Sequence, residues 1–229
     1  MKRYAIIVAG GQGLRMNSPV PKQFIKLDGK PILLHSLNKF LETDPTIDII
    51  LVLPEEHLKY WEQLCQEFMF NKPVSIAMRG ETRFHSVKSG LEFVKEESIV
   101  GIHDAVRPLV SSKTILAAYK AAEMYGNAVP AVPINDSIRQ IESTRTIAVD
   151  RSRYCATQTP QCFSSAIIKK AYEQEYRYTF TDDAMVVEAM GEQIRLVDGN
   201  PDNIKITSPK DLVIAEALLK LEAQPFGKS

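Results

Sequence analysis

Short apolar runs alternate with helical patterns along the first half of this chain, and this alternation strongly constrains its fold. Nearly continuous apolar runs occur at 5–9, 47–53, 74–78, 99–103 and 128–132. Between these runs, apolar residues recur at the spacing of an amphipathic helix. Strands that are apolar throughout are buried on both faces, and alternation of strand and helix favours right-handed crossovers. The sequence therefore predicts a Rossmann-like α/β fold with a mainly parallel sheet and helices on both faces.

The remaining elements follow from capping signals and short apolar stretches. We expect a strand at 193–197, a strand that ends near Lys205, and a final helix that covers the sheet. The start of that helix carries typical capping signals: Ser208 is the N-cap, Pro209 occupies the first turn, and Asp211 is the acidic residue that follows. The expected helices cover approximately residues 31–40, 55–68, 81–94, 112–125, 164–175, 181–190 and 209–221.

One region breaks the alternation. Residues 136–150 form two short stretches of alternating polarity around a polar turn, which predicts a β-hairpin. The hairpin has too little apolar surface to be stable alone, so we expect it to pack against another element, such as the same arm of a second subunit. We therefore interpret residues 1–229 as a single domain in which residues 134–152 form an inserted β-arm.

Composition excludes several classes of protein. The 28 basic residues balance 28 acidic residues, so no global field favours nucleic acid or an anionic membrane as a partner. The 3 cysteines lack metal-ligand spacing, and the 4 histidines are dispersed, which argues against a disulfide framework or a zinc site. No segment has the length of a membrane span, and the first apolar run is too short for a signal peptide. We expect a protein of the reducing cytoplasm.

The first apolar run ends in a turn with glycines at positions 10, 11 and 13, followed by Arg15 and Lys22. Glycines let the backbone curl until successive N–H groups converge on an anion, and the two cations add charge. The spacing fits neither the dinucleotide fingerprint nor the P-loop. The turn therefore predicts a phosphate-binding loop, and the alternative is a turn that merely joins two elements.

Two further polar loops follow predicted strands. Residues 80–86 open a helix, and residues 104–107 follow the apolar run at 99–103. Ligands of parallel sheets lie beyond the carboxyl ends of the strands, so we expect both loops and the glycine turn to meet in one crevice. The alternatives are ordinary helix capping with a solvated Arg83, and an Asp104–Arg107 pair that only stiffens its loop.

Several of these motifs carry a resemblance. Gly-Gly-x-Gly-x-Arg-Met, followed by Pro-Lys-Gln, resembles the signature of sugar-phosphate and polyol-phosphate nucleotidyltransferases. Pro-Lys-Gln-Phe, Gly-x-x-Arg-x-x-Ser-Val and His-Asp-Ala-Val-Arg-Pro resemble the cytidylyltransferase branch. Val-Asp-Arg before Thr-Pro-Gln, and later Asp-Asn-Ile-Lys-Ile-Thr, resemble the 2-C-methyl-D-erythritol 4-phosphate cytidylyltransferase family. Thr181-Asp182-Asp183 also resembles a family motif, although it first indicates a helix cap.

The resemblance implies roles for individual residues. Arg15 and Lys22 would be the catalytic cations at the α-phosphate of CTP. The acceptor would be positioned by Arg151, Lys205, Ser137 and Arg107, with Arg151 acting across a dimer and Ser137 standing where the family usually has threonine. The implied nucleotide-binding residues are Ala9, Gly10, Gly11, Gly13, Gly80, Glu81, Arg83, Ser86, Asp104 and Ala105.

The implied reaction is in-line attack of the acceptor phosphate on the α-phosphorus of CTP, with release of pyrophosphate. The acceptor is already anionic, so positioning and electrostatics suffice. Mg²⁺ is the implied cofactor, held mostly by the CTP phosphates with Asp104 as the candidate protein ligand. The resemblance also implies that the protein forms a homodimer in which the two arms cross between subunits. The implied product is an isoprenoid precursor of the non-mevalonate pathway. The alternatives are the ribitol 5-phosphate cytidylyltransferase branch and a non-catalytic CTP-binding module.

Overall fold

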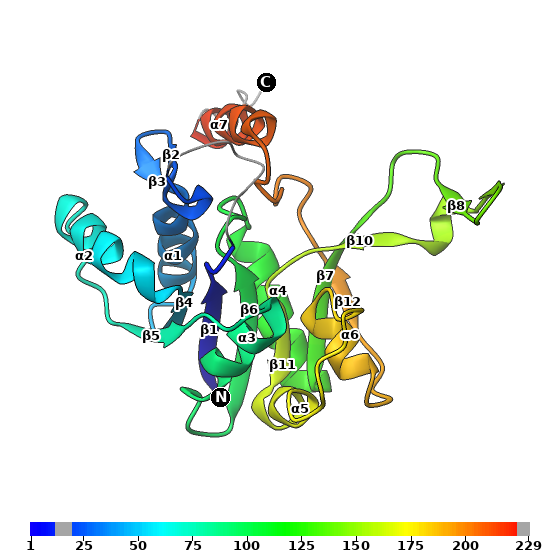
Figure 1. Cartoon of the computed structure of the whole chain (residues 1–229), viewed down its shortest axis with the longest axis horizontal. Helices are drawn as coiled ribbons and strands as arrows, with labels where there is room; N and C mark the ends of the chain where they lie inside the picture. Colours follow the sequence, from blue (N-terminus) through cyan, green and yellow to red (C-terminus); the bar gives the residue numbers. More distant parts are fainter. Residues whose placement is uncertain (12–19, 224–229) are drawn as a thin grey trace.

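A computed structural model of the chain describes residues 1–11 and 20–223 (Figure 1). Gly13 and Arg15, two residues of the predicted phosphate loop, lie outside the described residues. Among the described residues, no helix combines the length and the apolar character that crossing a membrane requires.

Four parallel strands form one half of the central sheet. They lie in the order β6, β1, β4, β5. Strands β1, β4 and β6 are largely buried, in agreement with their apolar sequences, whereas the edge strand β5 exposes Ser75 and Met78. Their carboxyl ends therefore meet at one edge. The bounds are β1 (Lys2–Val8), β4 (Asp48–Leu53), β5 (Val74–Met78) and β6 (Ser98–Asp104).

The other half of the sheet is mixed. Strand β11 lies between β6 and β7 and runs antiparallel to both, β10 is antiparallel to β7, and β12 is parallel to β7. The sequence did not predict β10 or β11, and the strand expected at 193–197 begins three residues later, while residues 203–207 form no strand. The predicted α/β class is nevertheless confirmed. The bounds are β7 (Asn127–Pro133), β10 (Cys155–Thr157), β11 (Gln161–Ser164) and β12 (Leu196–Asp198).

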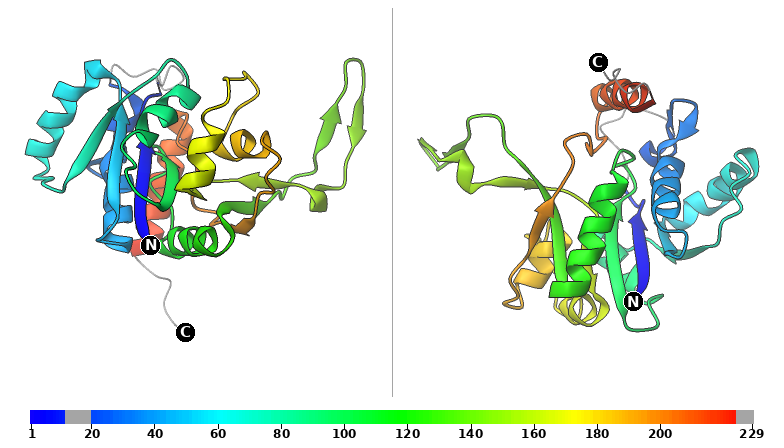
Figure 2. Two further views of the ribbon diagram at one scale, coloured as in Figure 1. Left: turned by 90° about the horizontal axis from the view of Figure 1, so that it is seen from below. Right: turned by 180° about the vertical axis from the view of Figure 1, so that it is seen from behind.

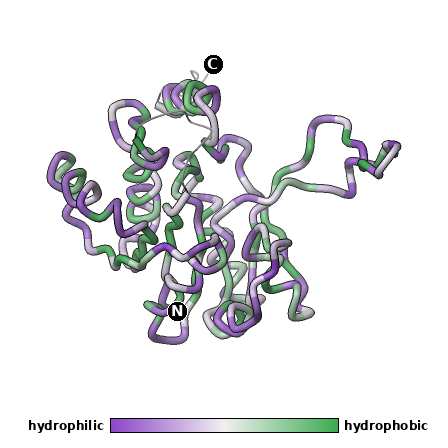
Figure 3. Tube along the Cα trace, in the orientation of Figure 1, coloured by the Kyte–Doolittle hydropathy of each residue, from purple (hydrophilic) through white to green (hydrophobic). Residues whose placement is uncertain are grey.

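Helices cover both faces of the sheet, as predicted. Alternate residues of β1 show the division, because Ala5 and Ile7 belong to one core and Tyr4 and Ile6 to the other. Figure 3 shows the hydrophobic residues gathered along the central strands between the helices. On the first face lie α1 (Ile32–Thr43), α2 (Leu58–Glu67) and α4 (Ser112–Tyr125). On the second lie α3 (Arg83–Leu91), α5 (Ser165–Ala171) and α6 (Asp183–Glu188).

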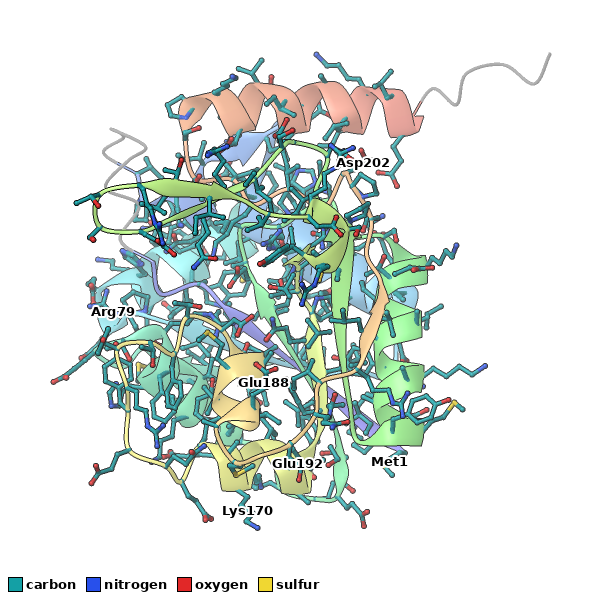
Figure 4. The ribbon with its side chains drawn as sticks, turned by 90° about the vertical axis from the view of Figure 1, so that its right-hand side faces the viewer. Met1, Arg79, Lys170, Glu188, Glu192 and Asp202 are labelled. Atoms are coloured by element: carbon teal, nitrogen blue, oxygen red, sulfur yellow. The ribbon has the colours of Figure 1, made fainter. Side chains whose placement is uncertain are left out.

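The last helix, α7 (Pro209–Ala223), does not cover the sheet, so that expectation was wrong. Its inner side joins a third core with the strand β2 (Lys26–Leu27), which pairs with β3 (Lys30–Pro31). The predicted cap is present, since Asp211 Oδ2 accepts the N–H of Ser208 at 2.8 Å. Figures 1 and 4 show α7 at the opposite end of the molecule from Met1.

The hairpin predicted within 136–150 is present as β8 (Arg139–Ile141) and β9 (Thr146–Ala148). Both strands are exposed throughout, and 84% of the Ile141 surface is open to solvent. Figure 2 shows the hairpin projecting away from the sheet. A two-stranded hairpin with exposed apolar residues gains little stability by itself. We therefore expect another protein surface to pack against this arm.

The tight packing of β6 against α4 gives a test of the first core. A Cβ at Gly101 would lie 2.4 Å from Oη of Tyr119, a buried side chain that donates a 2.7 Å hydrogen bond to the carbonyl of Tyr4. Because the ring has no free space, we expect Gly101→Ala to lower the free energy of unfolding by about 1–3 kcal/mol in urea titrations. Unchanged stability in a variant with wild-type circular dichroism would contradict this packing.

Candidate active site

A cavity of about 310 Å³ opens at the carboxyl ends of β1, β5 and β6. It is lined by residues 9–11, 80–83 and 104, together with Lys22 and Lys205. The three loops that the sequence predicted to converge therefore do so, as far as the described residues extend. The other lining residues are Val8, Gln23, Arg79, Ser86 and Val106.

The first loop brings a cation over the glycine turn. Lys22 begins the short helix η2 (Lys22–Phe24), which the buried Phe24 anchors in the core. A Cβ at Gly11 would lie 3.1 Å from Cε of Lys22, so the lysine side chain lies directly against the turn. Arg79, which the sequence reasoning missed, also lines the cavity and lies 3.5 Å from the carbonyl oxygen of Gly10 through Nη1. The signal for it was its position at the end of β5, directly before Gly80.

The second loop is held by its own hydroxyl groups. Ser86 lines the cavity, but its hydroxyl donates to the carbonyl of Thr82 at 2.8 Å and accepts the N–H of Gly80 at 3.2 Å. Thr82 also caps α3 by accepting the N–H of His85. Thr82 therefore caps the helix and Ser86 braces the loop, while Ser86, Glu81 and the backbone also lie beside the cavity.

The third loop places the Asp104 carboxylate among cations. Lys205 Nζ lies 2.8 Å from Oδ2, and the Nε atoms of Arg83 and Arg107 each lie 3.6 Å from one carboxylate oxygen. Burial alone would raise the pKa of Asp104, but the three positive charges hold that pKa well below its ordinary value. Asp104 is therefore ionised at neutral pH. The Asp104–Arg107 pair considered from sequence exists, yet it is one part of a larger charge cluster.

Lys205 reaches this cluster from an irregular segment. The segment is fixed on both sides, because Ile206 N–H donates to the Val106 carbonyl at 2.9 Å and the buried Asn203 donates to the Thr159 carbonyl at 2.9 Å. The Lys205 side chain is 42% exposed. Lys205 is therefore partly exposed but paired, because its ammonium group contacts Asp104.

A second cavity of about 190 Å³ adjoins the first. Arg83, Asp104 and Lys205 line both cavities, so this row of charges forms the boundary between them. Its other lining residues include Arg107, which the resemblance assigns to the acceptor, and residues of two motifs quoted for the resemblance, Thr-Pro-Gln and Thr181-Asp182. The full set is Arg107, Thr157, Gln158, Thr159, Gln161, Thr181 and Asp182.

Of the predicted site residues that lie in the described part of the chain, three do not line either cavity. Arg151 is exposed and donates to the carbonyl of Asn135, and Ser137 is exposed at the base of the arm. Ala105 is fully buried, with its N–H on the Val8 carbonyl at 3.1 Å and its side chain in the first core. Ala105 therefore supports the loop from behind, and the arm residues lie away from the site of their own chain.

A buried histidine ties the third loop together. The Arg107 carbonyl can only accept, so Nε2 of His103 carries a proton and donates to it at 3.1 Å. In the neutral ring Nδ1 is then an acceptor, and the Thr159 hydroxyl donates to it at 3.0 Å while its oxygen accepts the Asp104 N–H at 3.1 Å. Burial lowers the pKa of His103 to about 4, which agrees with that state.

The side chains at the site show how the implied magnesium ion could be bound. Within residues 1–11 and 20–223, no group of 3 or more His, Cys, Asp or Glu side chains is placed to hold a metal. Mg²⁺ commonly uses one or two carboxylates and completes its shell with substrate phosphates and water. Asp104 offers one ionised carboxylate that both cavities share, and because three cations already neutralise it, the nucleotide would supply most of the ligands.

Comparison with known proteins identifies the family. The family model described as "IspD: 2-C-methyl-D-erythritol 4-phosphate cytidylyltransferase" matches residues 4–221. The chain belongs to this family. A 2-C-methyl-D-erythritol 4-phosphate cytidylyltransferase of Phocaeicola vulgatus is 48% identical over 219 residues, which cover 96% of this chain and 100% of that protein. A relative of the same name from Caldanaerobacter subterraneus is 40% identical over 94% of this chain and 98% of its own.

Solved structures within the family share the fold. A 4-diphosphocytidyl-2C-methyl-D-erythritol synthase of Anaerococcus prevotii has a TM-score of 0.83 at 27% identity, and the match covers 96% of each chain. A 2-C-methyl-D-erythritol 4-phosphate cytidylyltransferase of Thermus thermophilus has a TM-score of 0.72 at 28% identity, covering 94% of this chain and 98% of that one. The family resemblance stated from motifs is thereby confirmed.

The neutral His103 predicts a specific pH dependence of stability. The ordinary pKa of histidine, 6.5, applies to the unfolded chain, so between pH 6.5 and 4 the unfolded state binds this proton more readily than the folded state. The stabilisation is complete above pH 6.5 and is lost as the pH falls toward 4. We expect a loss on the order of 3 kcal/mol over this window, measured by urea unfolding.

His103→Asn is the matched control, because an amide oxygen still accepts from Thr159 and does not titrate. The variant is expected to have a shallower dependence on pH than the wild-type protein between pH 6.5 and 4. Parallel curves for the two proteins would show that His103 is not kept neutral by the fold.

Proposed function

We propose that this protein transfers the cytidylyl group of CTP to 2-C-methyl-D-erythritol 4-phosphate, with release of pyrophosphate. The observation that carries the proposal is the pair of adjoining cavities that share Arg83, Asp104 and Lys205. Two anionic substrates repel each other, so a site that joins them needs cations at their boundary. Membership of the family supports the same reaction.

The first cavity suits the nucleotide. Its glycine turn offers backbone N–H groups, and Lys22 and Arg79 add positive charge beside them. We assign Lys22 and Arg15 to the α-phosphate, where they stabilise the charge of the transition state. Mg²⁺, when bound, would neutralise charge on the departing pyrophosphate, with Asp104 as its protein ligand.

The second cavity suits the acceptor. Arg107 and Lys205 present positive charge to an acceptor phosphate, and the hydroxyl and amide groups along its wall can bind alcohol groups. The attacking phosphate oxygen is already anionic, so no side chain has to remove a proton from it. The residues act by holding the two substrates in line.

The arm completes the acceptor side in a homodimer. Arg151 and Ser137 lie outside both cavities of their own chain, and the arm exposes apolar side chains such as Ile141. We propose that the arm of one subunit reaches the partner subunit, where Arg151 binds the acceptor phosphate. The three cysteines are unpaired, in keeping with a protein of the cytoplasm.

The choice of acceptor is tested by pyrophosphate release from CTP and Mg²⁺. We expect faster release with 2-C-methyl-D-erythritol 4-phosphate than with D-ribitol 5-phosphate, because the curated relatives bear the name of the erythritol reaction. The opposite order would assign the protein to the ribitol branch. Binding of CTP without release in the presence of either acceptor would support the non-catalytic module.

The shared site is tested by mixing two inactive variants. Lys22→Ala and Arg151→Ala are each expected to fold and to lose nearly all turnover. If a site uses Lys22 from one subunit and Arg151 from the other, a mixed dimer contains one intact site. Random mixing should then restore roughly a quarter of wild-type activity. No recovery, with mixed dimers shown by differently sized tags, would contradict a site shared between subunits.

A further inference from the structure

A buried carboxylate outside both cavities holds one of the residues that line them. Asp183 has no exposed surface, and its Oδ1 and Oδ2 atoms accept hydrogen bonds from Nη1 and Nη2 of Arg83 at 2.9 and 2.6 Å. The Tyr172 hydroxyl donates to the same Oδ1 at 2.6 Å. The reaction outlined above gives no role to Asp183 or Tyr172.

This pairing determines where Arg83 points. A guanidinium is planar and rigid, so two bonds to one carboxylate fix the direction of its remaining Nε–H. In this structure Nε is the atom of Arg83 that faces Asp104, at 3.6 Å from Oδ1. Asp104 in turn pairs with Lys205 at 2.8 Å. The orientation set by Asp183 therefore reaches the boundary between the two cavities.

The fold holds Asp183 and Tyr172 firmly. Gln161 accepts the N–H of Ala184 at 2.8 Å, which attaches the start of α6 to β11. The Tyr172 ring stacks on Phe84, the residue next to Arg83, with centroids 4.6 Å apart. Figure 4 shows α5 and α6, which carry the labelled Lys170 and Glu188, side by side on one side of the molecule. Helices α3, α5 and α6 thus form one packed unit behind Arg83, Asp104 and Lys205.

We propose that Asp183 and Tyr172 are positioning residues that hold Arg83, and through it Asp104 and Lys205, in the arrangement that binds both substrates. This inference rests on the proposed function for both of its substrates, but not on turnover. The Tyr172 hydroxyl limits the carboxylate of Asp183 to one orientation. Without it, Arg83 keeps its partner but loses part of its fixed direction.

Tyr172→Phe tests the proposal, because it removes one hydroxyl and keeps the ring that packs on Phe84. Tyr119→Phe is the matched control. Tyr119 is equally buried and donates one hydrogen bond, at 2.7 Å to the Tyr4 carbonyl, but it belongs to the core on the other face of the sheet. Loss of either hydroxyl should lower stability to a similar extent, so a difference in substrate binding cannot come from stability alone.

We expect Tyr172→Phe to raise the KM for CTP and for the acceptor by about threefold to tenfold, the effect of losing one buried hydrogen bond. The kcat should change less than about twofold, because Lys22 belongs to another loop. Tyr119→Phe should leave both KM values unchanged. Equal KM values in the two variants would overturn the proposal and leave Asp183 and Tyr172 with a structural role.

Calorimetric titration with CTP separates this inference from the proposed function. If the wild-type protein binds CTP but releases no pyrophosphate, the proposed function fails, and the affinities of the two tyrosine variants for CTP still decide the positioning role. A weaker affinity in Tyr172→Phe alone supports it, and equal affinities overturn it. Asp183→Asn, which keeps the shape of the carboxylate but not its charge, should weaken CTP binding further in every preparation that retains the wild-type circular dichroism.

Discussion

The charge cluster around Asp104 is the interaction on which this site depends. A carboxylate that is almost buried is unfavourable by itself, and three cations compensate for it from three separate parts of the chain. Arg83 comes from the start of α3, Arg107 from the loop after β6, and Lys205 from the segment before α7. Because each cation has Asp104 as a partner, the cluster joins these parts at one point.

The cluster also forms the boundary between the two cavities, where the two substrates would meet. Transfer between two phosphate groups needs positive charge where the substrates meet, in positions that do not have to rearrange during the reaction. The surrounding bonds provide that rigidity. His103 and Thr159 hold the backbone of Asp104, and Asn203 holds the segment of Lys205.

The arm, in contrast to the cluster, carries its residues away from the site. It carries residues that the family resemblance assigns to the acceptor, yet it leads them away from the cavities of its own chain and exposes apolar side chains. This separation is the reason for proposing that a second chain completes the site. Catalysis and assembly would then depend on the same segment.

Local patterns in the sequence determined the parallel half of the sheet, most helices and the three loops at the strand ends. Apolar strands and amphipathic helices are set by residues close together in the chain, and the carboxyl ends of parallel strands must meet at one edge. Membership of the family could be inferred from motifs for the same reason, since each motif is a short segment. Lys22, Arg83, Asp104 and Lys205 were all found in this way.

Only the tertiary structure decided which partners these residues take. Strands β10 and β11 are short and exist through pairing with β6 and β7, so no local period identifies them. The end of β10, the start of β11 and the segment between them form a wall of the second cavity, which the motif by itself does not indicate. The pairing of Arg83 with Asp183 joins residues 100 positions apart, and the burial of His103 follows from elements on several sides. A sequence shows which charges are present, but their electrostatic effect depends on distance and burial, which arise when the chain folds.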